Sequence, residues 1–351
     1  MITATTHERP GVYSSYEASS LTAASAGGGK VAVIAGVENP DKLDDIYQWT
    51  SYSKAASDVG NCTLSRLAQL AIRNGAGAVY GIPVKNGEDG EADYGTAFAA
   101  AEALEDVSVV VCDSTEEAVQ QDLKEMVEKC SMARKERIAV VGGKANETVA
   151  ELVRRAEGLN CERVVLVAPG MGGGSGGAGC AAAVAGAIAG TTDPALPLGG
   201  AQLYGLESLE QSYDDGEIDE LVRGGVTALE TLAGACYVVR GVTTKTKTGG
   251  VKDATWRELS TILVVDEVIP GLRNALRSKF SRAKNTQQTR GAIRSQTVLE
   301  LEKRVSREII DSYEDVTVSA LEDDPTVCLV EFSFTVAHGL NQVWLSAHIT
   351  V

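Results

Sequence analysis

The sequence predicts an α/β domain with a largely parallel sheet, followed by a C-terminal α+β domain, with extended β arms at both ends of the chain. Three observations lead to this fold class. Apolar runs and amphipathic segments alternate between residues 31 and 168, which is the order of a doubly wound sheet covered by helices on both faces. A threonine- and glycine-rich stretch at 243–254 interrupts the pattern. The chain then ends in two runs that alternate strictly between apolar and polar residues.

The elements of the α/β domain follow one another without long gaps. Short continuous apolar runs are typical of buried parallel strands, and helical periodicity between them indicates covering helices. The expected strands are 31–35, 78–84, 107–112, 137–141 and 163–168, and the expected helices are 62–74, 95–104, 115–131 and 146–157. Ser114 is predicted to be the N-cap of the third helix. A small-residue helix at 180–190, a helix at 221–232 and a strand at 238–241 complete this domain.

The second half of the chain predicts a compact α+β unit. Its expected elements are a segment at 255–265, a long helix at 267–280, a basic turn, a helix at 296–310 and strands at 316–320, 327–337 and 342–351. These elements divide the chain into an N-terminal arm (1–20), the α/β domain (21–242), a linker (243–254), the C-terminal domain (255–340) and a terminal strand arm (341–351).

The terminal strand has one face that needs covering. Successive side chains of a strand point to opposite faces, so strict alternation gives one apolar face. The apolar residues of the last strand are Val343, Leu345, Ala347, Ile349 and Val351. Chain ends normally fray, so a terminal strand of this kind must pair, either in its own sheet or in that of another subunit.

The charge is unevenly distributed. Residues 241–351 contain 14 Lys and Arg against 14 Asp and Glu, so the net charge of −16 comes entirely from residues 1–240. Within the neutral part, one run of basic residues is not interrupted by any acid: Arg273, Arg277, Lys279, Arg282, Lys284, Arg290 and Arg294. A locally basic face on an acidic protein favours a specific anionic partner over general nucleic-acid affinity. The alternative is an ordinary solvated helix face.

Composition argues against several other classes of protein. No run of about eighteen apolar residues is present, so no membrane span is expected. The first residues lack the apolar segment of a secretory signal peptide. Seven cysteines occur singly and only three histidines are present, which argues against disulfide frameworks and metal sites and favours reduced, mostly buried thiols.

A glycine-rich loop at Gly170–Gly177 offers an alternative function, that of an α/β nucleotide-dependent enzyme. The loop formally matches the dinucleotide fingerprint, and it lies after a strand and before a helix. However, it follows the fifth strand instead of the first, and no strand ending in Asp or Glu appears about twenty residues later. So many glycines also match the fingerprint by chance. A flexible loop leading into a closely packed helix is the better interpretation, and no cofactor is expected.

Four stretches of this sequence resemble the tail sheath proteins of contractile phages and of related R-type bacteriocins. The first comprises Arg9, Pro10, Gly11, Val12 and Tyr13. The second is 182–190 with Thr192, Asp193 and the proline loop that follows, the third is 239–244 with 256–260 and the helix after it, and the fourth is the double strand that ends at Val351. Their order and spacing carry the likeness. The chain departs from the family at Ile262 and Leu263, where two arginines are usual, and it lacks large insertions, as in compact Gram-positive sheaths.

The resemblance implies a structural protein without catalytic activity, cofactor or metal. Its subunits would stack as hexameric rings around an inner tail tube protein and contract to drive that tube through the target cell envelope. The residues Arg9–Tyr13 and the terminal strand would link neighbouring subunits. Other implied partners are baseplate and tail terminator proteins, without nucleic acid or direct membrane binding. The particle would be a virion tail or tail-like particle, assembled in the host bacterial cytoplasm.

The resemblance also orients the two domains. The C-terminal domain would lie inside, facing the tube, and the acidic α/β domain outside. The basic run from Arg273 to Arg294 is then our candidate for the tube-facing surface, paired with acidic residues of the tube. Exposed ion pairs are individually weak and are screened by salt, which suits contacts that must release.

Overall fold

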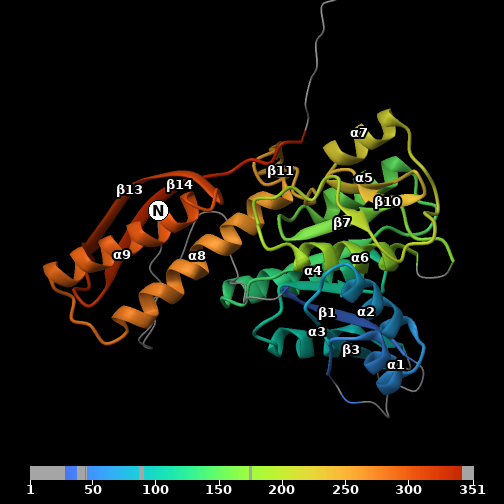
Figure 1. The fold of residues 1–351 in the computed structure, drawn as a ribbon, viewed down its shortest axis with the longest axis horizontal. Coiled ribbons are helices and arrows are strands. Elements are labelled where there is room, and N and C mark those ends of the chain that lie inside the picture. The colour runs from blue at the N-terminus through green and yellow to red at the C-terminus, as the bar shows by residue number, and fades with distance from the viewer. Residues whose placement is uncertain (1–27, 38–43, 45, 87–90, 174–175, 342–351) are drawn as a thin grey trace, which may run out of the picture.

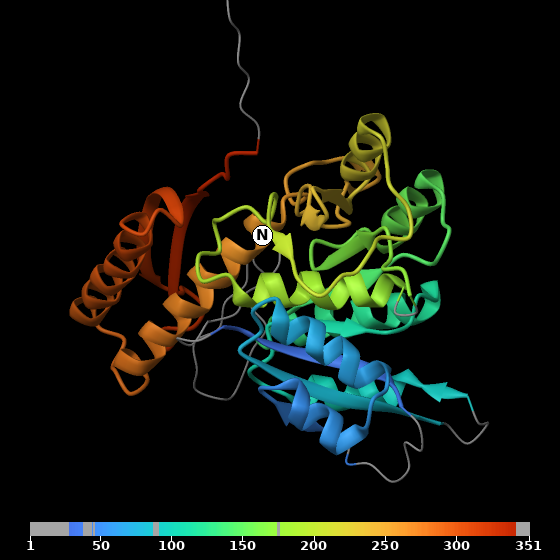
Figure 2. The same ribbon diagram turned by 45° about the vertical axis from the view of Figure 1, so that its right-hand side comes forward.

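A computed structural model describes residues 28–37, 44, 46–86, 91–173 and 176–341. These residues form an α/β unit and a smaller C-terminal unit, which are joined by the long helix α8 (Figures 1 and 2). The mixed α/β fold with a largely parallel sheet confirms the predicted fold class. The arms predicted at 1–20 and 341–351 lie outside the described residues, apart from residue 341.

The sheet of the α/β unit has six parallel strands at its centre, in the order β3-β1-β5-β6-β7-β9. Antiparallel strands extend the sheet at both ends. At one end β2 pairs with β3, and at the other end β10 pairs with β9 and β8 pairs with β10. The short β4 pairs with the end of β3. The strand bounds are β1 Lys30–Gly36, β2 Tyr47–Trp49, β3 Ala78–Asn86, β4 Ala92–Asp93, β5 Val109–Cys112, β6 Ile138–Gly142, β7 Val164–Ala168, β8 Gln202–Leu203, β9 Val226–Leu232 and β10 Ala235–Val238.

Helices cover both faces of this sheet because its central strands are apolar on both sides. One hydrophobic core lies under α1, α2 and α6, and a second lies under α3, α4, α5 and α7. The helix bounds are α1 Tyr52–Val59, α2 Thr63–Arg73, α3 Tyr94–Ala103, α4 Glu117–Met132, α5 Val149–Leu159, α6 Gly176–Gly190 and α7 Asp215–Arg223. The predicted alternation of strands and helices is thus confirmed for the α/β unit.

The helix predicted at 221–232 is wrong. Helix α7 begins earlier, where Asp214 and Glu217 form a capping box, and it ends before Gly224. Gly225 has a φ of 83°, which ends the helical path, and the β-branched residues after it form strand β9. The prediction that Ser114 is the N-cap of α4 is also wrong: Glu116 holds that position, and the Ser114 hydroxyl accepts a hydrogen bond from the Glu116 amide, which lies before the first residue of the helix.

The segment predicted as a linker is packed against the α/β unit. Thr243 and Thr244 are fully buried, and the Thr244 amide donates to the Val164 carbonyl over 2.8 Å. A small hairpin follows, formed by β11 (Lys247–Thr248) and β12 (Val251–Lys252). The connection between the two units is therefore anchored to the α/β unit where it begins.

The described residues of the C-terminal unit form two helices and one β-hairpin. These are α8 (Leu259–Phe280), α9 (Gln287–Val305), β13 (Ile310–Ala320) and β14 (Cys328–Val336). The segments predicted at 255–265 and 267–280 form one continuous helix, and α9 begins nine residues before its predicted start at 296. Leu259 and Ile262 of α8 belong to the α/β core, whereas Val264 and Val268 belong to the core of the C-terminal unit. Helix α8 is thus shared by both units.

Glycines bring helix α6 unusually close to the sheet. A methyl group added at Gly142 would overlap the backbone of Gly177. We expect Gly142→Ala to lower the free energy of unfolding by about 3 kcal/mol, because neither backbone can move away. Gly158→Ala is the matched control, since a methyl group there meets no atom within 4 Å. Chemical denaturation measures both, and equal stability of the two variants would contradict this close packing.

Candidate assembly surfaces

Among the described residues, no strand pairs with either outer edge of the β13–β14 hairpin. Its strands, of eleven and nine residues, pair only with each other among the described residues. One face packs on the helices through residues such as Val316, Phe332 and Phe334. The other face is polar, with Ser333, Thr335 and the acidic residues of both strands. The outer edges therefore present backbone N–H and C=O groups that another strand can pair with.

The main sheet ends differently. Its outermost strands, β2 and β8, have only three and two residues. Very short edge strands are a common way of preventing sheet extension. Within the part of the chain that the structure describes, long open strand edges therefore occur at the β13–β14 hairpin and not at the edges of the large sheet.

The two edges of the hairpin are unequal. Strand β13 is interrupted by two register shifts, and Asp315 within the second has a φ of 54°. Arg294 donates from Nε to the Val316 carbonyl over 2.8 Å, so one carbonyl group at this shift already has a partner. Strand β14 has no residue with positive φ along its length. The β14 edge is thus the more regular of the two.

The chain leaves the hairpin next to the α/β unit. After β14, the Ala337 amide donates to the Ile309 carbonyl over 3.3 Å, and Gly339 then lies against the ring of Pro197. Ala195, in the same proline loop, belongs to the core of the C-terminal unit. The terminal strand arm thus begins at a defined point between the two units. The predicted linking residues Arg9, Pro10, Gly11, Val12, Tyr13, Val343, Leu345, Ala347, Ile349 and Val351 lie outside the described residues.

The structure gives the seven basic residues different roles. Arg273 is only 10% exposed and pairs with the buried Glu136 over 2.8 Å, so it does not belong to a surface. Lys279 donates to Gln296 Oε1 over 2.5 Å, and Arg290 donates to Asn285 Oδ1 over 3.0 Å. Arg294 serves the β13 carbonyl described above. Lys279 and Arg294 are exposed despite these hydrogen bonds. The remaining three residues are also exposed, and they lie at the end of α8 and in the turn after it: Arg277, Arg282 and Lys284.

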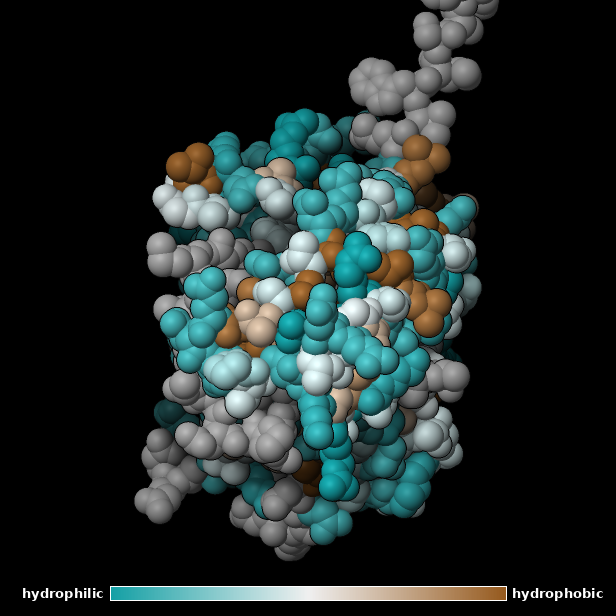
Figure 3. Space-filling view, turned by 90° about the vertical axis from the view of Figure 1, so that its left-hand side faces the viewer, coloured by the Kyte–Doolittle hydropathy of each residue, from teal (hydrophilic) through white to brown (hydrophobic). Residues whose placement is uncertain are grey.

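We call these three residues the basic tip. None of them has an ion pair within the part of the chain that the structure describes. Basic residues in the last turn of α8 also lie near the negative end of the helix dipole, which stabilises them there. The face of the C-terminal unit that points away from the α/β unit is largely hydrophilic, with apolar patches between the polar residues (Figure 3). The basic tip is therefore available for an acidic partner.

Contacts within the protein occupy the position where a doubly wound sheet usually binds its ligand, as far as the described residues show. The strand order reverses between β1 and β5, and ligands of such sheets bind beyond the carboxyl ends of the two strands at this point. Asp113 occupies that position, accepting from the Gly36 amide over 2.8 Å and from the Tyr94 hydroxyl over 2.7 Å. Burial, followed by the charge of Asp113, raises the pKa of Tyr94, so its hydroxyl stays protonated as a donor.

The described residues of the glycine-rich loop likewise make their contacts within the protein. Met171 forms bridges to Gly176 and to Leu209, and the Glu210 amide donates to the Gly170 carbonyl over 2.8 Å. A methyl group at Gly170 would lie 2.7 Å from the Glu210 carboxylate, so this carboxylate lies against the loop. A negative charge there opposes phosphate binding, which disfavours the nucleotide-dependent enzyme. The glycines instead allow close packing of the loop.

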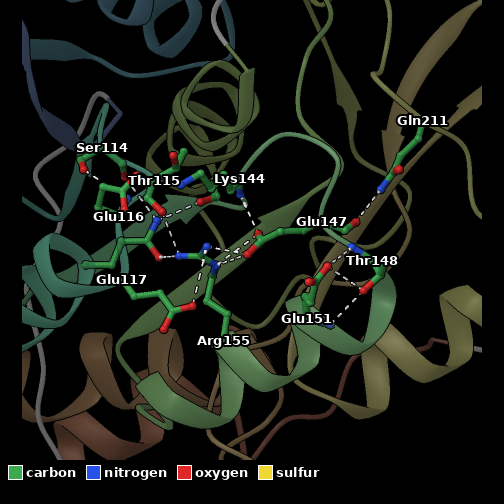
Figure 4. Close-up of polar contacts among 12 residues, drawn as sticks. Ser114, Thr115, Glu116, Glu117, Lys144, Glu147, Thr148, Glu151, Arg155 and Gln211 are labelled. Carbon is green, nitrogen blue, oxygen red and sulfur yellow. Dashed lines mark hydrogen bonds and ion pairs between the residues drawn. The ribbon is translucent and has the colours of Figure 1, made fainter.

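A polar cleft of about 480 Å³ lies between the starts of α4 and α5 (Figure 4). The buried Arg155 side chain lies at the bottom of this cleft and contacts Glu147 Oε1 over 2.5 Å. Arg155 also donates hydrogen bonds to the Thr115 carbonyl over 2.9 Å and to Gln120 Oε1 over 3.3 Å. These contacts satisfy the guanidinium from within the protein and tie α4, α5 and the loop after β6 together. We assign the cleft a structural role.

Buried thiols also lack the properties of nucleophiles. Burial raises the pKa of Cys112 to about 12 and that of Cys236 to about 11. Both thiols are therefore protonated at neutral pH and unreactive. Five of the seven cysteines are buried and Cys62 and Cys328 are partly buried, as the sequence predicts for reduced thiols.

Comparison with known families decides the identity of the chain. Residues 87–244 match the phage tail sheath protein central domain, and residues 251–350 match the phage tail sheath C-terminal domain. The chain belongs to the phage tail sheath family. It is a structural subunit of a contractile tail sheath, and the resemblance seen in the sequence is confirmed. No curated protein matches it in sequence.

Solved sheath structures share the fold of this sheath subunit over nearly its whole length. The sheath complex of an extracellular contractile injection system (PVC), in its contracted state, has a TM-score of 0.73 at 16% identity and covers 99% of both chains. The contracted helical sheath of the anti-feeding prophage has a TM-score of 0.72 at 14% identity, covering 98% of this chain and 99% of the other. A sheath tail protein from Desulfitobacterium hafniense has a TM-score of 0.66 at 14% identity, covering 93% and 100%.

Helices that could cross a membrane are not found among the described residues, since none is both long and apolar enough.

Proposed function

We propose that this sheath subunit polymerises as stacked hexameric rings around an inner tail tube protein, and that neighbouring subunits exchange strands at the β13–β14 hairpin. The observation that carries the proposal is the hairpin itself, with its open edges next to the point where the terminal strand arm begins. The apolar face of residues 343–351 and the residues Arg9–Tyr13 supply the strands that pair there. The regular β14 edge is the better acceptor.

Strand exchange suits a lattice that changes shape. Backbone pairing does not depend on the identity of the side chains, so the link survives when other surfaces repack. Contraction then replaces one set of subunit contacts with a larger one, and its energy is stored at assembly without nucleotide hydrolysis. In this arrangement the contracting sheath drives the tube through the target cell envelope. Catalysis has no part in it.

The basic tip is proposed to face the tube. The three charges of Arg277, Arg282 and Lys284 lie at one end of the C-terminal unit, while the net negative charge of the chain lies in residues 1–240. This separation supports an inner C-terminal unit against an acidic tube and an outer α/β unit. We also propose baseplate and tail terminator proteins as partners at the two ends of the sheath, in a virion tail or tail-like particle assembled in the host bacterial cytoplasm.

Electron microscopy of the purified full chain, with and without its tube protein, tests the proposal. We expect hollow tubular polymers, longer and narrower when they enclose the tube and shorter and wider after contraction. A helical reconstruction should show the hairpin extended by strands from neighbouring subunits. Closed rings that never stack, or polymers with an unextended hairpin, would contradict the proposed lattice.

A further inference from the structure

Helix α8 contains a weak point between the two units. Pro270 lies inside the helix and is followed by Gly271. Proline has no N–H, so the carbonyl of Asp266, four residues earlier, cannot receive its usual helical hydrogen bond. A proline next to a glycine is a common place for a helix to bend. Because α8 joins the two units, bending there would swing the C-terminal unit against the α/β unit.

An ion pair holds α8 just before this point. Arg163 precedes strand β7, and its Nη2 and Nη1 donate to the two carboxylate oxygens of Asp266 over 3.1 and 3.4 Å. The Arg163 side chain is 1% exposed and that of Asp266 is 8% exposed. Nη1 of Arg163 also donates to the Arg137 carbonyl over 3.1 Å, at the start of the neighbouring strand β6. The carboxylate on α8 is thus held against the amino ends of two parallel strands.

A second ion pair of opposite polarity holds α8 just after this point. Arg273 Nη2 contacts Glu136 Oε1 over 2.8 Å, and Glu136 lies two residues before strand β6. Asp266 and Arg273 are seven residues apart, so they lie on the same face of the helix about 10 Å from each other. At the same edge of the sheet, Asp266 of α8 is therefore paired with Arg163, and Arg273 of α8 with Glu136.

We propose that these four residues form a brace that keeps α8 straight across Pro270 and Gly271 and fixes the orientation of the C-terminal unit. A third contact lies at the same point, where the Arg304 guanidinium of α9 packs directly against Gly271. A methyl group added at Gly271 would overlap it. Arg304 also donates to the Glu267 carbonyl over 3.2 Å. The step between Pro270 and Gly271 is thus enclosed by the sheet edge on one side and by α9 on the other.

The ion pairs suit the role of orientation better than that of general stability. Buried ion pairs lose much of their attraction to desolvation, and apolar residues often replace them without loss of stability. Their geometry is nevertheless specific, because shifting α8 along the sheet edge would place like charges together. Burial also protects both pairs from salt. The consequence for contraction rests on the proposed function: conditions that loosen exposed contacts between subunits would leave each subunit rigid.

Hydrogen exchange of the full-length subunit tests the brace independently of sheath assembly. The variant E136Q/R273M removes both charges of one pair, so that neither Glu136 nor Arg273 is left as the unpaired charge of this ion pair. We expect amide exchange in residues 271–280 to rise on the order of tenfold or more, while exchange in α6 stays unchanged. Adding Pro270→Ala should cancel most of this rise, because a helix without the weak point does not need the brace.

The matched control is D219N/R223M, which removes an exposed ion pair from α7. It should change amide exchange neither in α8 nor in α6. Unchanged exchange of α8 in E136Q/R273M would overturn the proposal. An equal rise in the presence of Pro270→Ala, or a rise that α6 shares, would also overturn it, because either result would mean that the pair stabilises the whole fold. If E136Q/R273M does not fold, Arg273→Lys, which keeps the charge and loses the fork, is compared with and without Pro270→Ala by the same criteria.

Discussion

Removal of residues 342–351 is expected to abolish sheath polymers while leaving the subunit folded. The apolar face of β13 and β14 is covered by α8 and α9, so the C-terminal unit keeps its core without the terminal arm. The arm itself is proposed to pair in a neighbouring subunit. The midpoint temperature of thermal unfolding should therefore change by no more than about 3 °C. Electron microscopy and sedimentation, in contrast, should detect no tubular polymers.

Point variants within the arm separate strand pairing from mere length. L345D/I349D places two charges on the apolar face and should prevent assembly as the deletion does. S346A/T350A changes the opposite face of the same strand and should assemble normally. Tubes of normal yield from the deleted chain would show that the lattice is held together elsewhere.

The parallel order of the α/β unit could be predicted because its strands are short continuous apolar runs, and such runs between helical segments are typical of buried parallel strands. The prediction failed where two signals competed. Residues 221–232 contain leucines at helical spacing, but Gly224 and Gly225 end the helix, and the pairing of β9 with β7 and β10 then determines the structure. Pairing with strands distant in sequence is not visible in local periodicity.

Helix α8 shows the opposite failure. The sequence predicts a segment at 255–265 and a helix at 267–280 as separate elements, but the structure has one helix from Leu259 to Phe280, with Pro270 inside it. Tertiary contacts maintain it, because its first half lies in the core of the α/β unit and both ion pairs hold it against the sheet edge. A local penalty for proline was outweighed by contacts that only the folded chain reveals.

The basic run illustrates what sequence could not determine about the site. It showed seven basic residues without an intervening acid, but not which of them are used inside the protein. The partner of Arg273 is Glu136, 137 residues away, and Arg294 serves a carbonyl where the register of β13 shifts. Neither contact leaves a signal in the sequence. The structure thus places Arg273 inside the protein, and among the exposed basic residues we propose the three of the basic tip, which have no ion pair among the described residues, as the tube-facing charges.

Reversal of the three charges of the basic tip is expected to weaken binding of the tube without unfolding the subunit. In R277E/R282E/K284E, each attraction to an acidic tube becomes a repulsion. Exposed pairs contribute about 0.2–1 kcal/mol each, so affinity should fall by about 10- to 100-fold at low salt. The difference from the unmodified chain should shrink as salt rises toward 1 M, because the Debye length falls to about 3 Å. Co-sedimentation with purified tubes measures this.

A control triple of the same charge change identifies the surface involved. K54E/K129E/R223E reverses three exposed residues of the α/β unit, and it should bind the tube as the unmodified chain does if that unit faces outward. Equal loss in both triples would mean that only net charge matters, and no loss in the basic-tip variant would show that this surface points elsewhere. A release that depends on salt at the tip alone would agree with the division of contacts proposed for this subunit. Weak exposed charges would face the tube, while backbone pairing holds the lattice and buried ion pairs hold α8.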